Sequence, residues 1–238
     1  CENVPAPPKD TELNAKDNCG VESIKFNEVV VNGNCKNNYT ITRTWVVTDV
    51  NGNQTLKTQV IVVEDKKAPV IMYTNPILVG LMNGDTITFE CNAAPILNEN
   101  DVKVTDNCDA NPKISFVDEL MQPGDCKVDG FLMLMTCAWI AEDACGNTSK
   151  MQIFVKIVDT QAPTIKNVPS DVTINLASGQ TVPAVPKNIS AVDNCDIKPG
   201  LTFKADTTYS GCDFTIERKW TALDHCNNMT IQVQKIYV

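Results

Sequence analysis

The chain has 238 residues and a formal net charge of −9, and this acidic balance argues against nucleic-acid binding, which needs a basic surface. Its 11 cysteines include no C-x-x-C pair and it has one histidine, so we expect no zinc site of cysteine and histidine. No apolar run approaches the ~20 residues of a transmembrane helix, and we expect no membrane span in this chain. The abundant cysteine instead predicts an extracytoplasmic, disulfide-bonded protein.

Three motifs recur in a fixed order along the chain: Asp-Asn-Cys, a tryptophan followed four residues later by an aspartate, and a junction in which an aspartate precedes Ala-Pro. The Asp-Asn-Cys motifs begin at Asp17, Asp106 and Asp193, the tryptophans are Trp45, Trp139 and Trp220, and the junction aspartates are Asp65 and Asp159. We interpret this as three repeats, at residues 1–65, 66–159 and 160–238.

The first repeat is shorter than the second. Cys1 falls where Cys91 falls in the second repeat, so the counterpart of residues 68–90 is missing from the first. That segment contains two strand-like runs, and a sheet without them has an open edge. We therefore expect the chain to be a fragment of a longer array of repeats.

Short alternating runs dominate each repeat. Residues 39–47 have a period of two, which places Ile41, Arg43 and Trp45 on one face of a strand. Apolar runs at 59–63 and 152–158 predict a closing strand, and no segment shows a sustained helical period. One tryptophan in each repeat of ~90 residues predicts an all-β fold of tandem immunoglobulin-like β-sandwich domains. Ala-Pro linkers would arrange them as an elongated rod, because proline restricts the chain at each junction.

The combined motifs resemble a known family. Asp-Asn-Cys, a later Cys, Arg-Thr-Trp-x-x-x-Asp-x-x-Gly-Asn and Asp-x-x-Ala-Pro are similar to hyalin-repeat (HYR and HYR-like) modules. They are especially similar to the tandem modules of giant surface adhesins of Bacteroidota, including gliding-motility adhesins. The resemblance covers all three repeats and implies secreted immunoglobulin-like modules without catalytic activity. One departure is Val50, which stands where Cys145 and Cys226 stand in the later turns.

Two cysteine positions occur in every repeat, and we expect them to pair within the repeat. The predicted disulfides are Cys19–Cys35, Cys108–Cys126 and Cys195–Cys212. Each would close a short loop and contribute ~3 kcal/mol by the loop-entropy model. Cys91 would then pair with Cys145 or with Cys137. Spacing alone does not fix connectivity, so other pairings stay open.

Oxygen ligands gather at the same three motifs in each repeat. We expect three groups: Asp17, Asp49, Asn53 and Asp65 in the first repeat, Asp106, Asp143, Asn147 and Asp159 in the second, and Asp193, Asp224 and Asn228 in the third. Ca²⁺ takes six to eight oxygen ligands, which carboxylates, amides and backbone carbonyls at turns supply. The other interpretation is that these side chains only cap turns by hydrogen-bonding nearby backbone groups. Both interpretations stay open.

The sequence offers no catalytic constellation, since its histidine is alone and its carboxylates recur with the repeat as scaffold residues do. We predict a non-catalytic repeat segment of a large extracellular, cell-surface adhesin, in which repetition supplies reach and multivalency. Its expected partners are a polysaccharide, glycan or protein ligand on a cell surface or substratum, and neighbouring repeats of the same chain. The alternative is a carbohydrate-binding accessory module of a secreted hydrolase, which an exposed row of aromatic side chains would favour.

Overall fold

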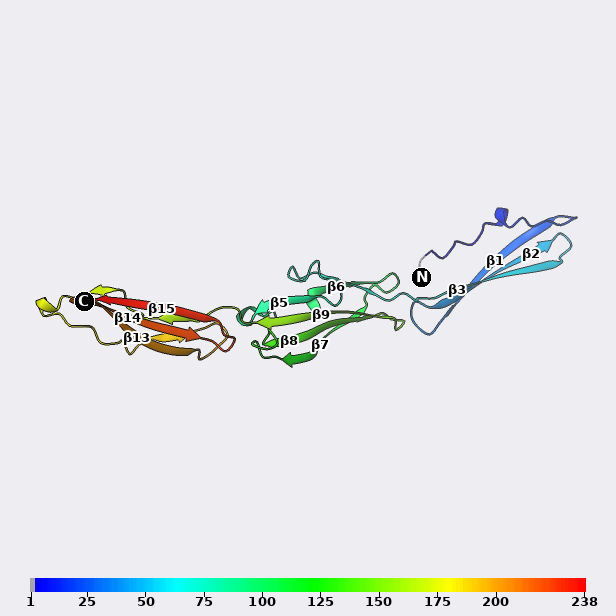
Figure 1. The fold of residues 1–238 in the computed structure, drawn as a ribbon. Helices are drawn as coiled ribbons and strands as arrows, with labels where there is room; N and C mark the ends of the chain where they lie inside the picture. The colour runs from blue at the N-terminus through cyan, green and yellow to red at the C-terminus, as the bar shows by residue number, and fades with distance from the viewer. Residues whose placement is uncertain (1–2) are drawn as a thin grey trace. The chain divides into compact units, whose positions relative to one another are not determined.

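A computed structural model describes residues 3–238 of the chain, and Cys1 lies outside the described residues (Figure 1). The described part contains fifteen β-strands, four 3-10 helices and no α-helix, so the prediction of an all-β fold is confirmed. The 3-10 helices are η1 (Asp10–Glu12), η2 (Cys91–Ala93), η3 (Glu99–Asp101) and η4 (Leu176–Ser178). None of its helices is long and apolar enough to cross a membrane.

The chain divides into two compact units. The first comprises residues up to 83 together with 97–117 and 138–152, and the second comprises 84–96, 118–137 and 153–238. This division does not follow the sequence repeats, because the middle repeat contributes residues to both units. The repeat boundaries given above therefore stay a prediction.

The first repeat forms one antiparallel sheet of order β1-β2-β3. Its strands are β1 (Val21–Asn32), β2 (Tyr39–Asp49) and β3 (Gln54–Val63). The alternation predicted for residues 39–47 is confirmed, since Ile41, Arg43 and Trp45 are all buried. Phe26 of β1 lies directly opposite Trp45, and their ring centroids are 5.3 Å apart.

The middle and third repeats each form a two-stranded and a four-stranded sheet. In the middle repeat, β4 (Val70–Tyr73) pairs with β6 (Val102–Thr105), and the larger sheet has β5 (Thr86–Glu90), β9 (Thr148–Val158), β8 (Met133–Glu142) and β7 (Lys113–Pro123) in that order. In the third repeat, β10 (Thr164–Lys166) pairs with β12 (Ser190–Val192), beside a sheet of β11 (Val172–Thr173), β15 (Met229–Tyr237), β14 (Asp213–Leu223) and β13 (Gly200–Ser210). β5 and β11 each run parallel to the last strand of their repeat.

A buried tryptophan connects the two sheets of the middle repeat. Trp139 of β8 is fully buried, and Tyr73 of β4 meets it edge-on with ring centroids 5.4 Å apart. Phe116 of β7 packs on the same indole at 5.1 Å. The indole N–H donates to the Asn98 carbonyl oxygen at 2.9 Å, which satisfies the polar atom of this core residue.

The third repeat is built in the same way. Trp220 of β14 and Ile165 of β10 belong to one buried apolar cluster, which Ala222 completes. The two sheets of this repeat therefore enclose a core, as in a β-sandwich of immunoglobulin type.

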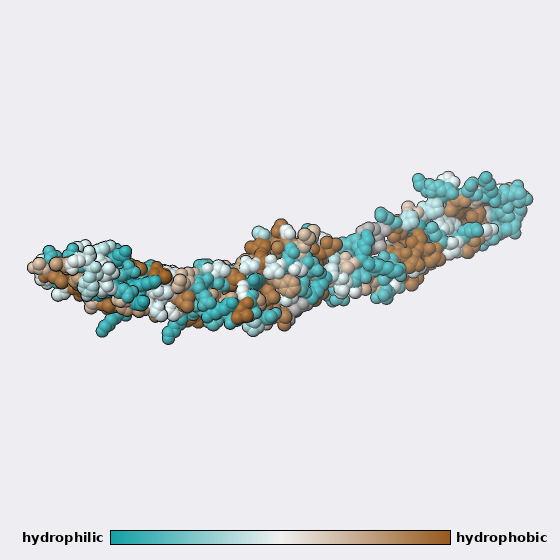
Figure 2. All heavy atoms as spheres, in the orientation of Figure 1, coloured by the Kyte–Doolittle hydropathy of each residue, from teal (hydrophilic) through white to brown (hydrophobic). Residues whose placement is uncertain are grey.

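The three-stranded sheet of the first repeat leaves apolar side chains in contact with solvent. Val30, Val31, Val60 and Val62 are between 53 and 63 % exposed, and Figure 2 shows brown apolar side chains over this part of the chain. Among the described residues β3 pairs with β2 alone and its other edge is open, whereas β5 and β11 pair with the outer edges of the corresponding strands β9 and β15. This agrees with the open sheet edge expected from the sequence.

Candidate metal centre

The turn after each tryptophan strand is built around one aspartate. Asp143 Oδ1 accepts hydrogen bonds from the backbone N–H groups of Cys145 and Asn147, both at 2.8 Å. Its Oδ2 accepts from the Asn147 side-chain amide at 2.7 Å. Burial raises the pKa of Asp143, but the hydrogen bonds from Asn147 and from the backbone of Cys145 and Gly146 together hold the pKa below its ordinary value.

The other two turns have the same geometry. Asn53 donates to Asp49 and Asn228 donates to Asp224, each from the backbone and from the side-chain amide, at 2.7 to 2.8 Å. The interpretation of these aspartates as turn caps is therefore confirmed.

The Asp-Asn-Cys aspartates cap a second kind of turn. Asp106 Oδ1 accepts from the backbone N–H groups of Cys108 and Asp109, both at 2.8 Å. Asp193 makes the same two bonds to Cys195 and Asp196, at 2.9 and 2.8 Å. The Oδ2 atoms of Asp106 and Asp193 are buried and accept no hydrogen bond. Each of these carboxylates therefore keeps one oxygen without a partner.

The turn asparagines reach the junction of the preceding repeat. The Asn147 side-chain amide donates to the Asp65 carbonyl oxygen at 3.2 Å, and that of Asn228 donates to the Asp159 carbonyl oxygen at 3.1 Å. The junction aspartates thus lie beside the motifs of the following repeat. The expected grouping of Asp159 with Asp106, Asp143 and Asn147, and of Asp65 with Asp17, Asp49 and Asn53, is wrong.

Sequence reasoning assigned each junction aspartate to the repeat in which its strand ends. The chain leaves that strand and continues towards the next repeat, so the carboxylate lies one repeat further on. The position of the junction could have indicated this placement, because the junction directly follows the last strand of each repeat.

The second unit therefore holds a cluster of acidic groups. One carboxylate oxygen each from Asp159, Asp193 and Asp224 lies within 4.8 Å of the others. Asp159 is 7 % exposed, and its Oδ1 has no hydrogen-bond partner. Glu90 also lies beside Asp159, where it accepts from the Thr160 backbone N–H at 3.2 Å.

This cluster carries uncompensated negative charge. Burial, followed by the charges of Asp193 and Asp224, raises the pKa of Asp159 to about 6. The described ion pairs, Arg43–Glu28 and Lys66–Glu64, involve none of these carboxylates.

The first unit holds a smaller counterpart. A carboxylate oxygen of Asp65 lies close to one of Asp106, beside the sulfur of Cys108. Asp65 is 4 % exposed, and its Oδ2 has no partner. Cys108 is disulfide-bonded, so its sulfur offers no thiolate ligand. Among the described residues no junction carboxylate groups with Asp17, Asp49 and Asn53 of the first repeat, and Asp17 is exposed.

The second unit's cluster fits a hard divalent cation. Ca²⁺–oxygen distances of roughly 2.3–2.6 Å allow two ligands of one ion to be up to about 5 Å apart, and the three oxygens satisfy that limit. Two of these aspartates, Asp159 and Asp193, also carry buried oxygens that no protein group satisfies. Three carboxylates leave the remaining coordination positions to backbone carbonyls and water.

Cystines link the three repeats. The disulfides that join two described cysteines are Cys35–Cys145, Cys91–Cys195 and Cys126–Cys226, with sequence separations of 110, 104 and 100 residues. Each of them joins cysteines that the sequence assigns to successive repeats, and each lies within one compact unit.

The predicted pairs within a repeat are therefore wrong. Cys19 and Cys212 are free, Cys35, Cys126 and Cys195 have other partners, and Cys91 pairs with neither Cys145 nor Cys137. The physical reason is strand length, since β1 separates Cys19 from Cys35 by 12 residues of strand. An extended strand of that length spans ~40 Å, whereas the Cα atoms of a cystine lie about 5.5–6 Å apart. β7 and β13 separate the other two pairs in the same way.

No family model matches the chain, and no curated protein matches it. Among solved structures, it is similar to domains EC3-6 of protocadherin gammaB7, with 12 % identity, a TM-score of 0.34 and coverage of 94 % of this chain and 70 % of that chain. It is also similar to the human desmocollin-1 ectodomain, with 11 % identity, a TM-score of 0.31 and coverage of 90 % and 53 %. Drosophila N-cadherin EC1-4 is similar with 14 % identity, a TM-score of 0.24 and coverage of 93 % of this chain and 68 % of that chain.

The chain spans about half the length of two similar structures, 53 % for the desmocollin-1 ectodomain and 45 % for the protocadherin gammaB4 extracellular domain. Because the TM-scores are below 0.5, these similarities support no argument about what this chain does.

Proposed function

We propose that this chain is a non-catalytic segment of an extracellular adhesive repeat protein, in which the modules form a stalk. The observation that carries the proposal is the set of cystines that join successive repeats. Cystines persist in oxidising extracellular compartments. A bond between modules resists their separation, which serves a protein that transmits force to a surface. The similarity to HYR-like adhesins agrees with this function, and a role in gliding motility rests on that resemblance alone.

The alternative of a carbohydrate-binding accessory module meets an obstacle in the tryptophans. Trp45, Trp139 and Trp220 are 5 %, 0 % and 2 % exposed, so none of them presents a ring face on which a sugar can stack.

The adhesive role is tested with beads that carry the purified chain, on a glycan array and on surfaces coated with whole bacterial cells. We expect retention on the cell-coated surfaces, and loss of retention for control beads that carry the reduced and alkylated chain. Binding to one class of sugar, without retention on cells, would favour the carbohydrate-binding alternative. Retention on none of these surfaces would contradict an adhesive function.

We further propose that the Asp159, Asp193 and Asp224 cluster binds a divalent cation, with Ca²⁺ as the ion that suits oxygen ligands in a flexible geometry. The support is the proximity of three carboxylates together with buried oxygens that lack partners. A cation there would neutralise the repulsion and connect the junction to two motifs of the following repeat. It would thereby stiffen that junction under load.

Calcium should stabilise the chain, and Asp159→Asn should remove most of that effect. At 100 times the dissociation constant, a bound ion stabilises the folded state by about 2.7 kcal/mol. Without calcium, we expect the variant to be more stable than the parent at pH 7.5. A carboxyl whose folded pKa is about 6, against an ordinary 3.8, loses stability as the pH rises through that interval. The variant should therefore melt higher than the parent at pH 7.5 in EDTA, and the two should converge near pH 4.

The measurement is calorimetric melting with and without calcium, beside a direct calcium titration. Asp206→Asn, which changes an exposed carboxylate on β13, is the matched control and should keep the calcium response of the parent. A parent chain that shows neither heat of binding nor a melting shift would dispose of the cation site and leave the cystine-linked stalk intact.

A further inference from the structure

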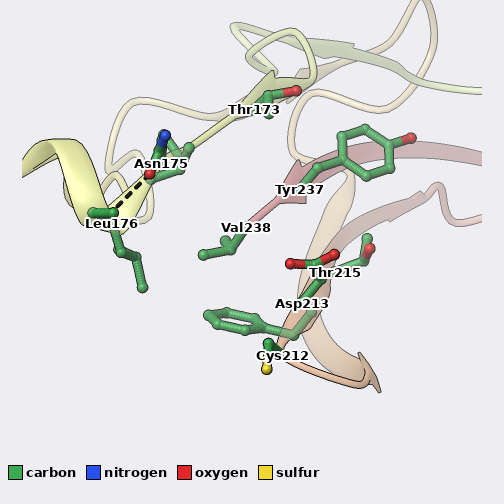
Figure 3. A pocket seen from close by; sticks show the side chains of 11 residues that line it. Thr173, Asn175, Leu176, Cys212, Asp213, Thr215, Tyr237 and Val238 are labelled. Carbon is green, nitrogen blue, oxygen red and sulfur yellow. Dashed lines mark hydrogen bonds between the residues drawn. The ribbon is translucent and has the colours of Figure 1, made fainter.

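A pocket in the second unit surrounds a free cysteine. The pocket has a volume of about 680 Å³, and its lining includes Leu176, Cys212, Phe214 and Val238. Cys212 lies in the tight turn between β13 and β14, and its thiol is exposed and unpaired. Figure 3 shows Cys212 on the same side of the pocket as Asp213, with Leu176 on the opposite side.

Cys212 occupies a position that is bonded in the other two repeats. Cys35 lies in the connection between β1 and β2, and Cys126 lies in the connection between β7 and β8. Both precede the strand that carries the buried tryptophan, as Cys212 does. Cys35 is bonded to Cys145 and Cys126 is bonded to Cys226.

The partner follows the same rule in both cases. Cys145 and Cys226 each lie two residues after the buried aspartate that caps the turn of the following repeat, Asp143 or Asp224. A hairpin cysteine therefore bonds to the turn cysteine one repeat further along the chain. The third hairpin cysteine is the one that lacks this partner among the described residues.

The segment that lines the pocket opposite Cys212 also corresponds to a segment of the middle repeat that carries a disulfide. In the middle repeat, η2 follows the parallel strand β5 and carries Cys91, which bonds to Cys195 of the Asp-Asn-Cys motif in the third repeat. In the third repeat, η4 follows the parallel strand β11 and begins with Leu176. Leu176 is 53 % exposed and lines the pocket. Where the middle repeat has a second covalent bond, the third repeat thus has an exposed apolar side chain that lines the same pocket as the free thiol.

We propose that this pocket is the docking surface for a further module of the same repeat type, and that Cys212 forms a disulfide with the cysteine of that module's Asp-x-Cys turn. The proposal rests on the proposed stalk function and names the partner of one of its faces. Two thiols are oxidised to one cystine, and an oxidised low-molecular-weight disulfide such as glutathione disulfide takes the two electrons and two protons and leaves as two thiols.

A second copy of this chain does not supply that partner. Its turn cysteines, Cys145 and Cys226, are already bonded, and its first turn has Val50 in the corresponding position. The occupant is therefore a module whose turn cysteine is unpaired before docking.

The test extends the full chain after Val238 with a copy of residues 158–238, which continues the register of the repeats. In the added copy, the cysteines corresponding to Cys195 and Cys212 are changed to serine, so that the original Cys212 has one designed partner. The matched control changes the added turn cysteine, the copy of Cys226, to valine as in the natural turn at Val50. Both proteins are oxidised with glutathione disulfide, alkylated under denaturing conditions and digested without reduction.

We expect most molecules of the extended chain to contain a peptide that links Cys212 to the added turn cysteine. Alkylation of Cys212 should be nearly complete in the control and should fall at least fivefold in the extended chain. An added module that gains β-sheet signal and a melting transition of its own, while Cys212 stays alkylated, would overturn the proposal. Predominant Cys212–Cys212 bonds between copies would overturn it too. Neither result would affect retention on cells, which tests the proposed function separately.

Discussion

Replacing Trp139 by alanine is expected to lower the free energy of unfolding by about 3–5 kcal/mol, the range for truncating a fully buried large aromatic side chain. Trp139 is fully buried between Tyr73 and Phe116, and its N–H is bonded to the Asn98 carbonyl oxygen. The variant loses both ring contacts, leaves a cavity between the two sheets and leaves that carbonyl without its indole donor.

Calorimetric melting of parent and variant measures this loss. Tyr209→Ala is the control, because Tyr209 is an aromatic residue on β13 that is 75 % exposed, and its melting shift should be small. Trp139→Phe should give an intermediate result, since it retains an aromatic ring without the N–H. A loss below about 1 kcal/mol for Trp139→Ala would show that this indole does not form the core of the middle repeat.

Removing the Cys126–Cys226 cystine is the second change with a large expected effect. The bond closes a loop with a sequence separation of 100 residues. Constraining a loop of that length contributes about 4.7 kcal/mol in the loop-entropy model, more than the ~3 kcal/mol of a loop within one repeat. The double variant Cys126→Ser with Cys226→Ser should therefore be destabilised by several kcal/mol in calorimetric melting without reductant.

Cys19→Ser is the matched control, because Cys19 is a free and exposed cysteine of the same repeat pattern. Its effect should stay within about 0.5 kcal/mol. Reduction of the parent protein should reproduce the effect of the double variant and add the loss of the other cystines. Equal stability of the double variant and the parent would mean that this bond does not constrain the unfolded chain.

The strands, the core tryptophans and the turn aspartates were predictable because they depend on local pattern. Alternation places Ile41, Arg43 and Trp45 on the buried face whatever the rest of the chain does, and it is confirmed. The capping of Asp143 by Asn147 likewise depends on residues four positions apart.

The cystines were not predictable from spacing, because their partners lie about one repeat away in sequence. Cys19 and Cys35 are close in sequence, but they lie at opposite ends of the extended strand β1. Counting strand residues between two cysteines would have excluded this pairing, because each residue adds roughly 3.3 Å. That simple test would not have chosen Cys145 as the partner of Cys35, since this choice requires the arrangement of two repeats.

The cluster of Asp159, Asp193 and Asp224 shows the same division between local and non-local information. The aspartates of the cluster were among the residues predicted from the sequence, because the motifs concentrate oxygen ligands. Their grouping failed because Asp159 belongs by sequence to the end of one repeat and by position to the motifs of the next. Because Asp159 and Asp224 are far apart in sequence, the sequence alone does not indicate that their carboxylate oxygens lie close together.

The central claim is that cystines join successive repeats, and mapping the disulfides of the purified chain by mass spectrometry tests it most directly. The protein is alkylated under denaturing conditions and digested without reduction. The account predicts peptides that link Cys35 to Cys145, Cys91 to Cys195 and Cys126 to Cys226, with Cys19, Cys137 and Cys212 alkylated. Peptides that link Cys19 to Cys35 or Cys195 to Cys212 would contradict it, because the repeats would then be closed individually.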